Sequence, residues 1–357
     1  MAAKTPTMLQ SALIGTQDGN IRLCDYSPVP EVPANAVLIK VKAVSVNPAD
    51  SKMTGAFVTP GAVAGNDVAG VVEKVGSDVA GVKVGDRVST SVMGMNPLKP
   101  TVGAFAEYTT ALEHLLLKLP PTISLEEGAS VPISFTTAAL GLFHHLGLPG
   151  GPLEPTSNVA AIKVLVYGGS SATGTAAIQL LKLAGFEVLT TCSPHNFDLV
   201  RGYGADIVFD YKAPDCATEI RKQTRNCLKY VLDCISTLSS MQFCYQAMGR
   251  AGGKYTALEP FPEAIARTRR VIKDDWVMAL QALGHDIAWP EPHFRPADEA
   301  ITKFGVAWAK TMNELLARGL VRTHPLIIRE GGLNRVLEGI EDVRSKKFSG
   351  KKLVVTL

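Results

Sequence analysis

The feature that most constrains the fold of this chain is a strand, a glycine turn and a helix in direct succession. Val164–Tyr167 is a continuous apolar run, Gly168 and Gly169 follow it, and helical spacing begins near Thr175. Further along, as far as 254–257, short apolar runs alternate with helical stretches of about ten residues. Strands interleaved with short helices predict βαβ units on a parallel sheet.

The glycine turn predicts a phosphate site. It reads Tyr167-Gly168-Gly169-Ser170-Ser171-Ala172-Thr173-Gly174. Main-chain N–H groups and the dipole at the start of a helix attract a pyrophosphate. Ser171 replaces the middle glycine of the usual pattern, so a plain turn between strand and helix is the alternative. The strand before the turn and the alternating units after it favour a dinucleotide site.

The end of the next strand indicates which dinucleotide is bound. NAD sites usually place Asp or Glu there to hold the ribose 2′-hydroxyl. This chain instead has Thr191-Cys192-Ser193-Pro194-His195-Asn196, without a carboxylate. Hydroxyl, imidazole and amide groups can donate to a 2′-phosphate, so NADPH is favoured over NADH. In the alternative reading, Ser193 or Asn196 merely caps the next helix.

The first part of the chain is predicted to be β-rich. Short alternating strands are expected at 37–44, 70–76 and 85–88, a spacing typical of a barrel or sandwich. Helical spacing follows over 124–146, opened by a possible capping box of Ser124 and Glu127. A Pro-, Gly- and Ser-rich loop at 147–161 is the best candidate for a domain boundary. A last strand, 352–357, could return to either domain.

Composition excludes several function classes. The net charge is +3 over 357 residues, and the basic residues are spread out, which gives no support to a nucleic-acid or membrane partner. The six cysteines form no C-x-x-C pair, so a disulfide framework or structural zinc is not expected and a reducing compartment fits. No signal sequence or membrane span is evident, which makes the cytoplasm the default location.

Several motifs in order resemble the quinone-reductase-like branch of the medium-chain dehydrogenase/reductases. They are Val46-Asn47-Pro48-Ala49-Asp50, Gly65-Asn66-Asp67-Val68-Ala69-Gly70, Gly85-Asp86-Arg87-Val88, Gly103-Ala104-Phe105-Ala106-Glu107-Tyr108 and the glycine turn. The resemblance implies an α/β fold with a GroES-like barrel domain, 1–157 and 310–357, and a Rossmann domain with a doubly wound parallel sheet, 158–309.

The chain departs from the zinc-using members of that family. Those relatives carry Gly-His-Glu where Gly65-Asn66-Asp67 stands, a Cys ligand near Ala43, and a four-Cys lobe around 90–110. Here no Cys lies between Cys24 and Cys192. Zinc prefers Cys, His or carboxylate ligands, so the resemblance implies a zinc-independent enzyme without a metal. The Tyr-x-x-x-Lys pair of short-chain reductases and the Gly-x-Ser-x-Gly elbow are also absent.

Three stretches resemble the trans-acting enoyl reductases of fungal polyketide synthases more closely. They are Tyr167 to Thr173, Cys192-Ser193-Pro194-His195-Asn196-Phe197-Asp198-Leu199 and Gly249-Arg250-Ala251-Gly252-Gly253. This resemblance implies an NADPH-dependent reductase that works in secondary metabolism. Its substrate would be an α,β-unsaturated polyketide thioester on the acyl carrier protein of a synthase or synthase–peptide synthetase hybrid. It also implies a monomer.

The resemblance assigns cofactor-binding roles to residues of both predicted domains. They are Ala49, Asp50, Ser51 and Lys52 on the nicotinamide side; Ser170, Ser171, Ala172 and Thr173 at the phosphates; Ser193, Pro194, His195, Asn196 and Tyr211 at the 2′-phosphate; Leu258 and Glu259 at the nicotinamide; and Lys346 and Lys347 closing the site. Tyr211 could instead be a simple strand-end residue, and Lys346 with Lys347 a solvated pair.

The same resemblance suggests catalytic and substrate residues. Lys52 and Thr137 are candidates to stabilise the negative charge that develops on the thioester oxygen, although Lys52 could equally bind cofactor hydroxyls. The sequence does not identify the proton donor, and His144 and His145 are expected on a helix surface. Predicted channel residues are Ala138, Ala139, Leu140, Gly141, Leu142, Leu280, Gln281, Ala282, Leu283 and Gly284, unless the small ones serve only helix–sheet packing.

Two further hypotheses stay open. One is a free-standing NADPH-dependent quinone or 2-alkenal reductase of the same fold. The other is a non-catalytic NADP-binding protein. For the polyketide hypothesis, carrier recognition is expected on an exposed basic surface, for which Arg267, Arg269, Arg270 and Lys273 are the candidates.

Overall fold

A computed structural model describes residues 8–155 and 162–357, and the chain divides into two compact units. The first contains residues up to Ile133 together with Leu280–Leu357, and the second is Ser134–Ala279. The sequence places domain boundaries elsewhere, at 157/158, which lies outside the described residues, and at 309/310. The early return of the chain to the first unit has a physical reason, because helix α9 (Glu299–Ala317) packs against β7 (Leu117–Lys118). The predicted boundaries stay a prediction.

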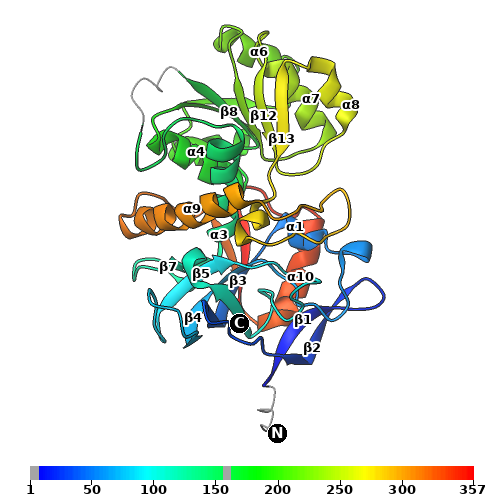
Figure 1. Ribbon diagram of the computed structural model, residues 1–357. Coiled ribbons are helices and arrows are strands. Elements are labelled where there is room, and N and C mark those ends of the chain that lie inside the picture. The colour runs from blue at the N-terminus through cyan, green and yellow to red at the C-terminus, as the bar shows by residue number, and fades with distance from the viewer. Residues whose placement is uncertain (1–7, 156–161) are drawn as a thin grey trace. The chain divides into compact units, whose positions relative to one another are not determined.

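The second unit is built on a six-stranded parallel sheet (Figure 1). Its strands run in the order β10-β9-β8-β11-β12-β13. Their bounds are β8 Lys163–Tyr167, β9 Glu187–Cys192, β10 Ile207–Asp210, β11 Tyr230–Asp233, β12 Gly253–Ala257 and β13 Ile272–Trp276. The order reverses between β8 and β11, and doubly wound sheets bind their ligands at such a switch point, outside the carboxyl ends of the strands. The predicted alternation of strands and helices is confirmed.

Helices connect these strands. They are α4 Ala172–Leu183, α5 Phe197–Gly202, α6 Cys216–Gln223, α7 Leu238–Ala247 and α8 Glu263–Ala266, with 3₁₀ turns at Pro194–Asn196 and Arg267–Arg269. α4 packs on β8 and β9, while α6 and α7 pack on each other (Figure 1). The inner face of α4 is apolar, and Ile178, Leu180 and Leu181 are fully buried there.

The first unit is a β structure that also takes the end of the chain. Its seven-stranded sheet runs β14-β15-β3-β4-β5-β7, and β6 also pairs with β3; β1 and β2 form a separate pair. The strands are β1 Leu9–Gly15, β2 Ile21–Pro28, β3 Ala36–Val46, β4 Asp67–Val75, β5 Arg87–Ser91, β6 Tyr108–Leu112, β7 Leu117–Lys118, β14 Leu326–Arg329 and β15 Lys352–Thr356. The last strand, β15, lies antiparallel to β3, so the C-terminal strand returns to the first unit.

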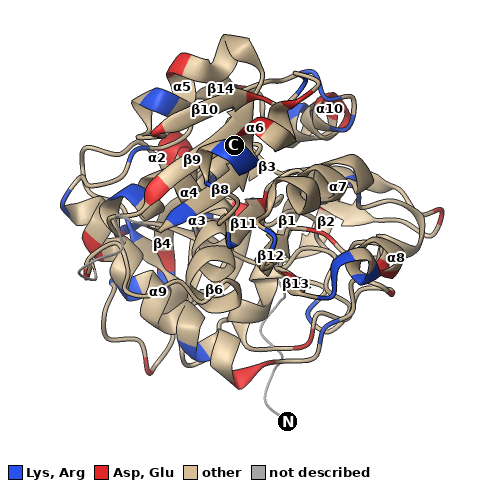
Figure 2. Ribbon diagram, turned by 90° about the horizontal axis from the view of Figure 1, so that it is seen from above, with Lys and Arg blue, Asp and Glu red and all other residues tan. Residues whose placement is uncertain are grey.

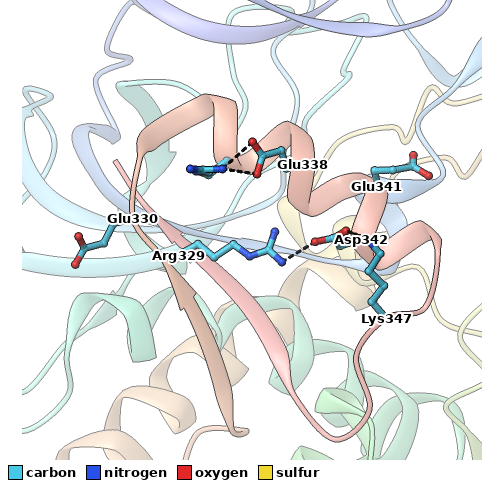
Figure 3. A pocket seen from close by; sticks show the side chains of 7 residues that line it. Arg329, Glu330, Glu338, Glu341, Asp342 and Lys347 are labelled. Carbon is cyan, nitrogen blue, oxygen red and sulfur yellow. Dashed lines mark hydrogen bonds and ion pairs between the residues drawn. The ribbon is translucent and has the colours of Figure 1, made fainter.

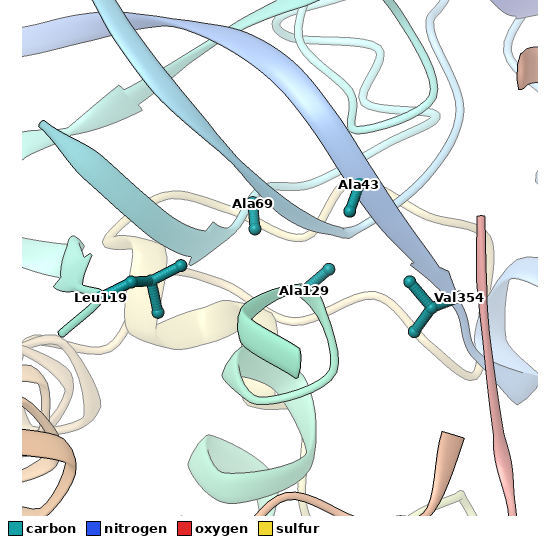
Figure 4. Close-up of a cluster of buried hydrophobic side chains, with 5 residues drawn as sticks. All are labelled: Ala43, Ala69, Leu119, Ala129 and Val354. Carbon is teal, nitrogen blue, oxygen red and sulfur yellow. The ribbon is translucent and has the colours of Figure 1, made fainter. Parts of the chain in front are cut away.

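Helices and turns complete the first unit. They are α1 Pro48–Ser51, α2 Leu125–Ala129, α9 Glu299–Ala317 and α10 Gly332–Arg344, with 3₁₀ turns at Gly55–Phe57, Glu113–Leu115 and Ala279–Leu283. A tight apolar cluster lies between the sheet and α2, formed by Ala43, Ala69, Leu119, Ala129 and Val354 (Figure 4). Ala43, the position near which zinc-using relatives carry a Cys ligand, is fully buried in this cluster.

The helical stretch predicted over 124–146 is three pieces. α2 begins with the expected capping box, since Ser124 accepts from the Glu127 amide and Glu127 from the Ser124 amide. α3, Pro132–Ala139, starts at a proline, which cannot donate to a preceding turn and disfavours helical backbone at the residue before it. A π-helical turn, Leu140–His145, follows. The predicted helical spacing is therefore confirmed, and the structure divides it into separate pieces.

Charged side chains are mixed in sign over the surface (Figure 2). On α9, Lys303 pairs with Glu299 and Arg318 with Glu314, one turn apart. In the part of the chain that the structure describes, no helix combines the length and apolar character needed to cross a bilayer.

Candidate functional site

The glycine turn lies at the carboxyl end of β8, beside the switch point of the parallel sheet. Gly168 has a φ of 79°, a left-handed conformation that favours glycine. A Cβ on Gly169 would lie 1.9 Å from the Thr190 hydroxyl, and one on Gly174 would lie 2.4 Å from the carbonyl oxygen of Gly168. These glycines therefore let the turn fold tightly and bring the start of α4 against it.

Ser171, the residue that breaks the usual glycine pattern, caps α4. Its hydroxyl donates to the Gly168 carbonyl at 2.8 Å and accepts from the Gly174 amide at 3.0 Å. The side chain thus closes the turn and satisfies one amide at the helix start. The first-turn amides of Ala172 and Thr173 have no acceptor within a helix, which is what an anion site at a helix N-terminus offers. The predicted phosphate residues 170–173 are all half-buried at this point.

The end of β9 adjoins the glycine turn. The Gly168 amide donates to the Thr191 hydroxyl at 3.2 Å, and the Gly169 amide donates to the Thr191 carbonyl at 3.0 Å. Beyond β9, Pro194 and His195 are exposed, Ser193 is half-buried and Asn196 is buried. Neither Ser193 nor Asn196 makes a side-chain capping hydrogen bond to the helix that follows it. The alternative interpretation, in which Ser193 or Asn196 merely caps the next helix, therefore loses its support.

Tyr211 follows β10 at the same edge of the sheet. Its ring meets Tyr167 edge-on at 6.1 Å between centroids, and its side chain is partly exposed. Lys212, which the sequence analysis did not select, places its ammonium nitrogen 5.8 Å from the centre of the Tyr211 ring. The structure thus adds a cation beside a residue predicted to surround the 2′-phosphate. Its position next to Tyr211 in the sequence was the signal that could have found it.

The ends of β11 and β12 carry residues that sequence reasoning missed. Asp233 accepts from the Ile235 and Ser236 amides at 2.9 Å, and the Tyr255 hydroxyl donates to it at 2.9 Å. This holds Ser236 in a left-handed backbone, φ 56°, a strained state for a serine. The Ser236 hydroxyl accepts from the Leu258 amide at 2.7 Å.

The turn at 233–236 lies beside two residues that are predicted to bind the cofactor. Leu258 and Glu259 are half-buried there. Ile235 is 47% exposed although it is apolar, and a Cβ on Gly168 would lie 2.6 Å from its side chain. Burial raises the pKa of Asp233, whose carboxyl group faces the protein interior. An exposed isoleucine beside the glycine turn is a candidate contact for a bound dinucleotide.

In the first unit, the predicted cofactor residues 49–52 form α1 and its C-terminus. Lys52 is exposed, Ala49 is half-buried, and Asp50 and Ser51 are buried. The Asp50 carboxylate accepts from the Asn47 amide at 2.7 Å and from the Asn66 side chain at 2.6 Å. Both of its oxygens thus accept hydrogen bonds within the first unit, and its predicted cofactor role stays a prediction. Burial raises its pKa to about 7, and Asp67 adds to the rise.

Lys346 and Lys347 follow α10, the helix that packs on α1. Lys346 has a left-handed φ of 54°, and the Lys347 ammonium pairs with Asp342. Arg344, on the last turn of α10, donates to the Ser51 carbonyl at 3.0 Å. The structure thus brings the predicted segments 49–52 and 346–347 onto adjoining elements of one unit.

A surface pocket lies along α10 and β14 (Figure 3). Its lining residues are Arg329, Glu330, Arg335, Glu338, Glu341, Asp342 and Lys347. Arg329 pairs with Asp342 at 2.6 Å and Arg335 with Glu338 at 2.7 Å. Three of its side chains are cationic and four are anionic, and the Lys347 ammonium is paired with Asp342.

The predicted substrate residues on α3 and its π-helical extension are buried. Ala138, Ala139, Leu140 and Leu142 have no exposed surface, and Thr137 is 7% exposed. A Cβ on Gly141 would lie 2.8 Å from the Leu232 side chain, so this glycine serves close packing on the sheet. The packing alternative therefore explains Gly141, and the channel role of 138–142 stays a prediction.

The second predicted substrate segment, 280–284, belongs to the first unit. Leu280, Gln281 and Ala282 are buried, and the Gln281 side chain donates to the Pro296 carbonyl at 3.0 Å. Leu283 is half-buried and Gly284 exposed. A Cβ on Gly305 of α9 would lie 2.7 Å from that of Ala282, which shows how closely the helix packs on this segment.

The expectation that His145 lies on a helix surface was wrong. Its side chain is only 8% exposed, its Nδ1 lies 2.7 Å from the Asp275 carboxylate, and its Nε2 is buried without a hydrogen-bond partner. The π-helical turn shifts the register of the helix at this point and directs the ring towards β13.

Only some of the residues that were predicted to form a basic surface are exposed. Basic residues gather between α8 and β13 (Figure 2). Arg269, however, donates to the Met248 carbonyl at 3.1 Å and the Gly249 carbonyl at 2.6 Å, beyond the end of α7. Arg267 pairs with Glu263. Arg270 and Lys273 remain exposed.

Across residues 8–155 and 162–357, no group of three or more His, Cys, Asp or Glu side chains is arranged to hold a metal ion. Asn66 and Asp67, which stand where zinc-using relatives carry His and Glu, are buried and bonded to Asp50 and Lys352. Independence from zinc stays a prediction.

Two family models match the chain. The alcohol dehydrogenase GroES-like domain matches residues 33–121, and the model described as zinc-binding dehydrogenase matches 172–257. Among solved structures, the CurK enoyl reductase is similar in fold, with a TM-score of 0.71 at 19% identity over 98% of both chains.

Curated relatives are far more similar in sequence. The trans-enoyl reductase fsa3 of Fusarium sp. (strain FN080326) is 63% identical over 98% of this chain and 99% of its own. The trans-enoyl reductase eqxC of Fusarium heterosporum is 62% identical over the same shares. At this identity over the full length, the chain belongs to the trans-enoyl reductases of the medium-chain dehydrogenase/reductase family.

Proposed function

We propose that this protein is an NADPH-dependent enoyl reductase that acts in trans on unsaturated acyl thioesters carried by a fungal polyketide synthase. The family membership supports the enoyl reduction, the work with a synthase in secondary metabolism and the use of a nicotinamide cofactor. The choice of NADPH rests on one observation. The loop after β9 holds Ser193, His195 and Asn196 without a carboxylate, and neither Ser193 nor Asn196 caps the next helix.

The residues present fit a dinucleotide phosphate. The glycines of the turn stand where an added Cβ would clash, so the turn closes tightly. The start of α4 offers its main-chain amides to an anion. Lys212 beside Tyr211 adds a positive charge where a 2′-phosphate is proposed. When bound, the cofactor supplies the hydride that the reduction needs.

The protein's own residues have the task of stabilising charge. Reduction of the double bond places negative charge on the thioester oxygen, and donors held there lower the barrier. Lys52 of the first unit and Thr137 of the second are the proposed donors. Lys52 directly follows α1, a helix that is fixed from several sides, so the backbone that carries its ammonium group is held in place.

The proposed partner is the acyl carrier protein of a polyketide synthase or of a synthase–peptide synthetase hybrid. Arg267, Arg270 and Lys273 are the exposed residues of the basic surface proposed for docking, and Arg267 is paired with Glu263. Binding of NADPH, location in the cytoplasm and a monomeric state are parts of the same proposal.

A kinetic comparison tests the reaction. The purified protein is mixed with an enoyl thioester of a phosphopantetheine analogue, and consumption of NADPH and of NADH is followed separately. We expect turnover with NADPH and a much lower kcat/KM with NADH. Turnover of quinones alone, with no thioester reduced, would instead favour the free-standing quinone reductase. Cofactor binding without any turnover would favour the non-catalytic NADP-binding protein.

A further inference from the structure

A buried polar cluster lies beneath the helix that presents Lys52. Its members are at most 6% exposed, although all five are ionisable or amide side chains: Asn47, Asp50, Asn66, Asp67 and Lys352. Buried charges are costly unless they are paired and hydrogen-bonded. A cluster of this kind in the interior of a β unit therefore has a reason beyond packing.

Lys352 is the cation of the cluster. It comes from the first residue of β15, and its ammonium lies 3.0 Å from an Asp67 oxygen and 2.9 Å from the Asn47 side-chain oxygen. The Asn47 side chain in turn donates to the same Asp67 oxygen at 3.0 Å. Ammonium, amide and carboxylate thus form a closed triangle, in which Asn47 is the residue that precedes α1.

Asp67 connects this triangle to the rest of the unit. It also accepts from the Ser45 hydroxyl on β3 and from the Ile133 amide, both at 2.9 Å. Four donors from three separate parts of the chain therefore converge on one carboxylate. Such a fully satisfied network fixes the relative positions of the elements that supply its donors.

The other side of α1 is held by separate contacts. Asp50 accepts from the Asn47 amide and the Asn66 side chain, and Arg344 donates to the Ser51 carbonyl. Lys52 is the next residue after this segment and is exposed. The contacts of Asn47, Asp50 and Ser51 hold the segment 47–51, which directly precedes Lys52.

We propose that Lys352 is a positioning residue, which acts through Asn47 and Asp67 to hold α1 in the orientation that presents Lys52 to the substrate. This inference rests on the proposed function of Lys52. Lys352 itself contacts neither substrate nor cofactor in this role, and its ammonium serves as a fixed internal cation for the loop.

The charges facing the cluster support this arrangement. Burial has the largest effect on the pKa of Asp50 and raises it. The negative charge of Asp67 raises this pKa further, and the positive charge of Lys352 lowers it. Buried His324 also faces Lys352, and its pKa is lowered to about 4, mainly by burial. The ammonium is therefore the positive charge that the two carboxylates share.

Two variants of the full-length protein test the proposal. The double variant Lys352→Met with Asp67→Asn removes both charges of the ion pair, which avoids leaving one of them unpaired. Asn47→Ala keeps the ion pair and removes its connection to α1, together with the side chain at the N-cap of that helix. Arg318→Gln, which removes an exposed ion pair on α9, is the matched control.

The first readout is amide hydrogen exchange of the segment 47–53, which does not depend on any reaction. We expect exchange there to rise by about tenfold or more in both variants, with the sheet strands unchanged outside the cluster. The second readout is kcat and KM for the enoyl thioester. Here kcat is expected to fall by about tenfold with KM within a factor of about two, because misplacement acts on the transition state.

The outcomes separate the two proposals. If wild type and Arg318→Gln reduce no thioester while exchange rises in the variants, the proposed function falls and the positioning role stands. If wild type is active and a folded Asn47→Ala variant keeps both its kcat and its protection at 47–53, the positioning role is wrong. Should the double variant fail to fold, Asn47→Ala alone decides.

Discussion

The two functional regions of this protein are built in opposite ways. In the second unit, the proposed phosphate site is a stretch of main chain, where Gly168, Gly169 and Gly174 allow close approach and Ser171 closes the turn. In the first unit, the segment 47–52 packs on a set of buried side chains centred on Asp67 and Lys352. One region depends on the absence of side chains, and the other on their charges and hydrogen bonds.

This difference determines how each region responds to change. A main-chain site is sensitive to any added atom, whereas its polar groups have no pKa to shift. A buried ionic cluster tolerates exchange of matched partners but responds to pH and to the loss of one charge. The following variants test this contrast, in order from the largest expected effect to the smallest.

The largest effect is expected at Gly174. Gly174→Val would place side-chain atoms against the Gly168 carbonyl and the Gly169 Cα, which are main-chain atoms that cannot move away without opening the turn. We expect NADPH affinity to fall by more than about 100-fold, or roughly 3 kcal/mol. Isothermal titration of the cofactor measures it.

A matched glycine in the same unit serves as the control. A Cβ on Gly202, the last residue of α5, would meet no atom within 4 Å, and the φ of this glycine is not left-handed. Gly202→Ala should therefore bind NADPH like the wild type. An unchanged affinity in Gly174→Val would contradict the main-chain account of the phosphate site.

Lys52→Ala tests the residue that the first unit presents. Loss of one donor to the developing charge is expected to lower kcat by about 10²- to 10³-fold, in line with the loss of a single oxyanion donor. Because Lys52 is exposed, the free energy of unfolding should change little. Comparing single-turnover rates with urea denaturation separates the two effects, and an unchanged rate removes Lys52 from the mechanism.

Ser193→Asp tests cofactor choice. A carboxylate beside the 2′-phosphate repels it and can accept from a free 2′-hydroxyl. We expect the ratio of kcat/KM for NADPH over NADH to fall by about 10- to 100-fold. The exposed change Gln223→Glu on α6, which adds the same negative charge outside this loop, serves as a control for charge alone. A preference that stays with NADPH in Ser193→Asp would place the 2′-phosphate elsewhere.

Asp50→Asn tests the ionic character of the first region through pH. The folded-state pKa of Asp50, about 7, is above its ordinary value of 3.8, so the folded protein binds the proton more tightly than the unfolded chain. Stability from this group is therefore present at low pH and is lost as the pH rises through about 7. The loss between pH 4 and 8 is on the order of a few kcal/mol.

The variant is expected to lack this fall in stability. His324 acts in the opposite direction, because its lowered pKa costs stability as the pH falls from 6.5 to about 4. Comparing urea unfolding of the variant and the wild type at each pH cancels that contribution. Equal pH dependence in both proteins would show that Asp50 is not the buried titrating group.

The same contrast explains what could be predicted from the sequence. The glycine turn, its strand and its helix are adjacent in the chain, so local patterns were enough to place them and the parallel sheet. The Asp67–Lys352 pair joins residues 285 positions apart, and no local pattern signals it. The left-handed Ser236 and the inward-turned His145 were missed for a related reason, since tertiary contacts to Asp233 and Asp275 determine them.

The most direct test of the central claim is a reconstitution. A fungal polyketide synthase that lacks enoyl reduction is incubated with its substrates and NADPH, with and without this protein, and the saturation of the product is measured by mass spectrometry. We predict that the chain gains two hydrogens at the reduced position only when the protein and NADPH are both present. Products of identical saturation with and without the protein, in a mixture where the synthase is active, would contradict the account.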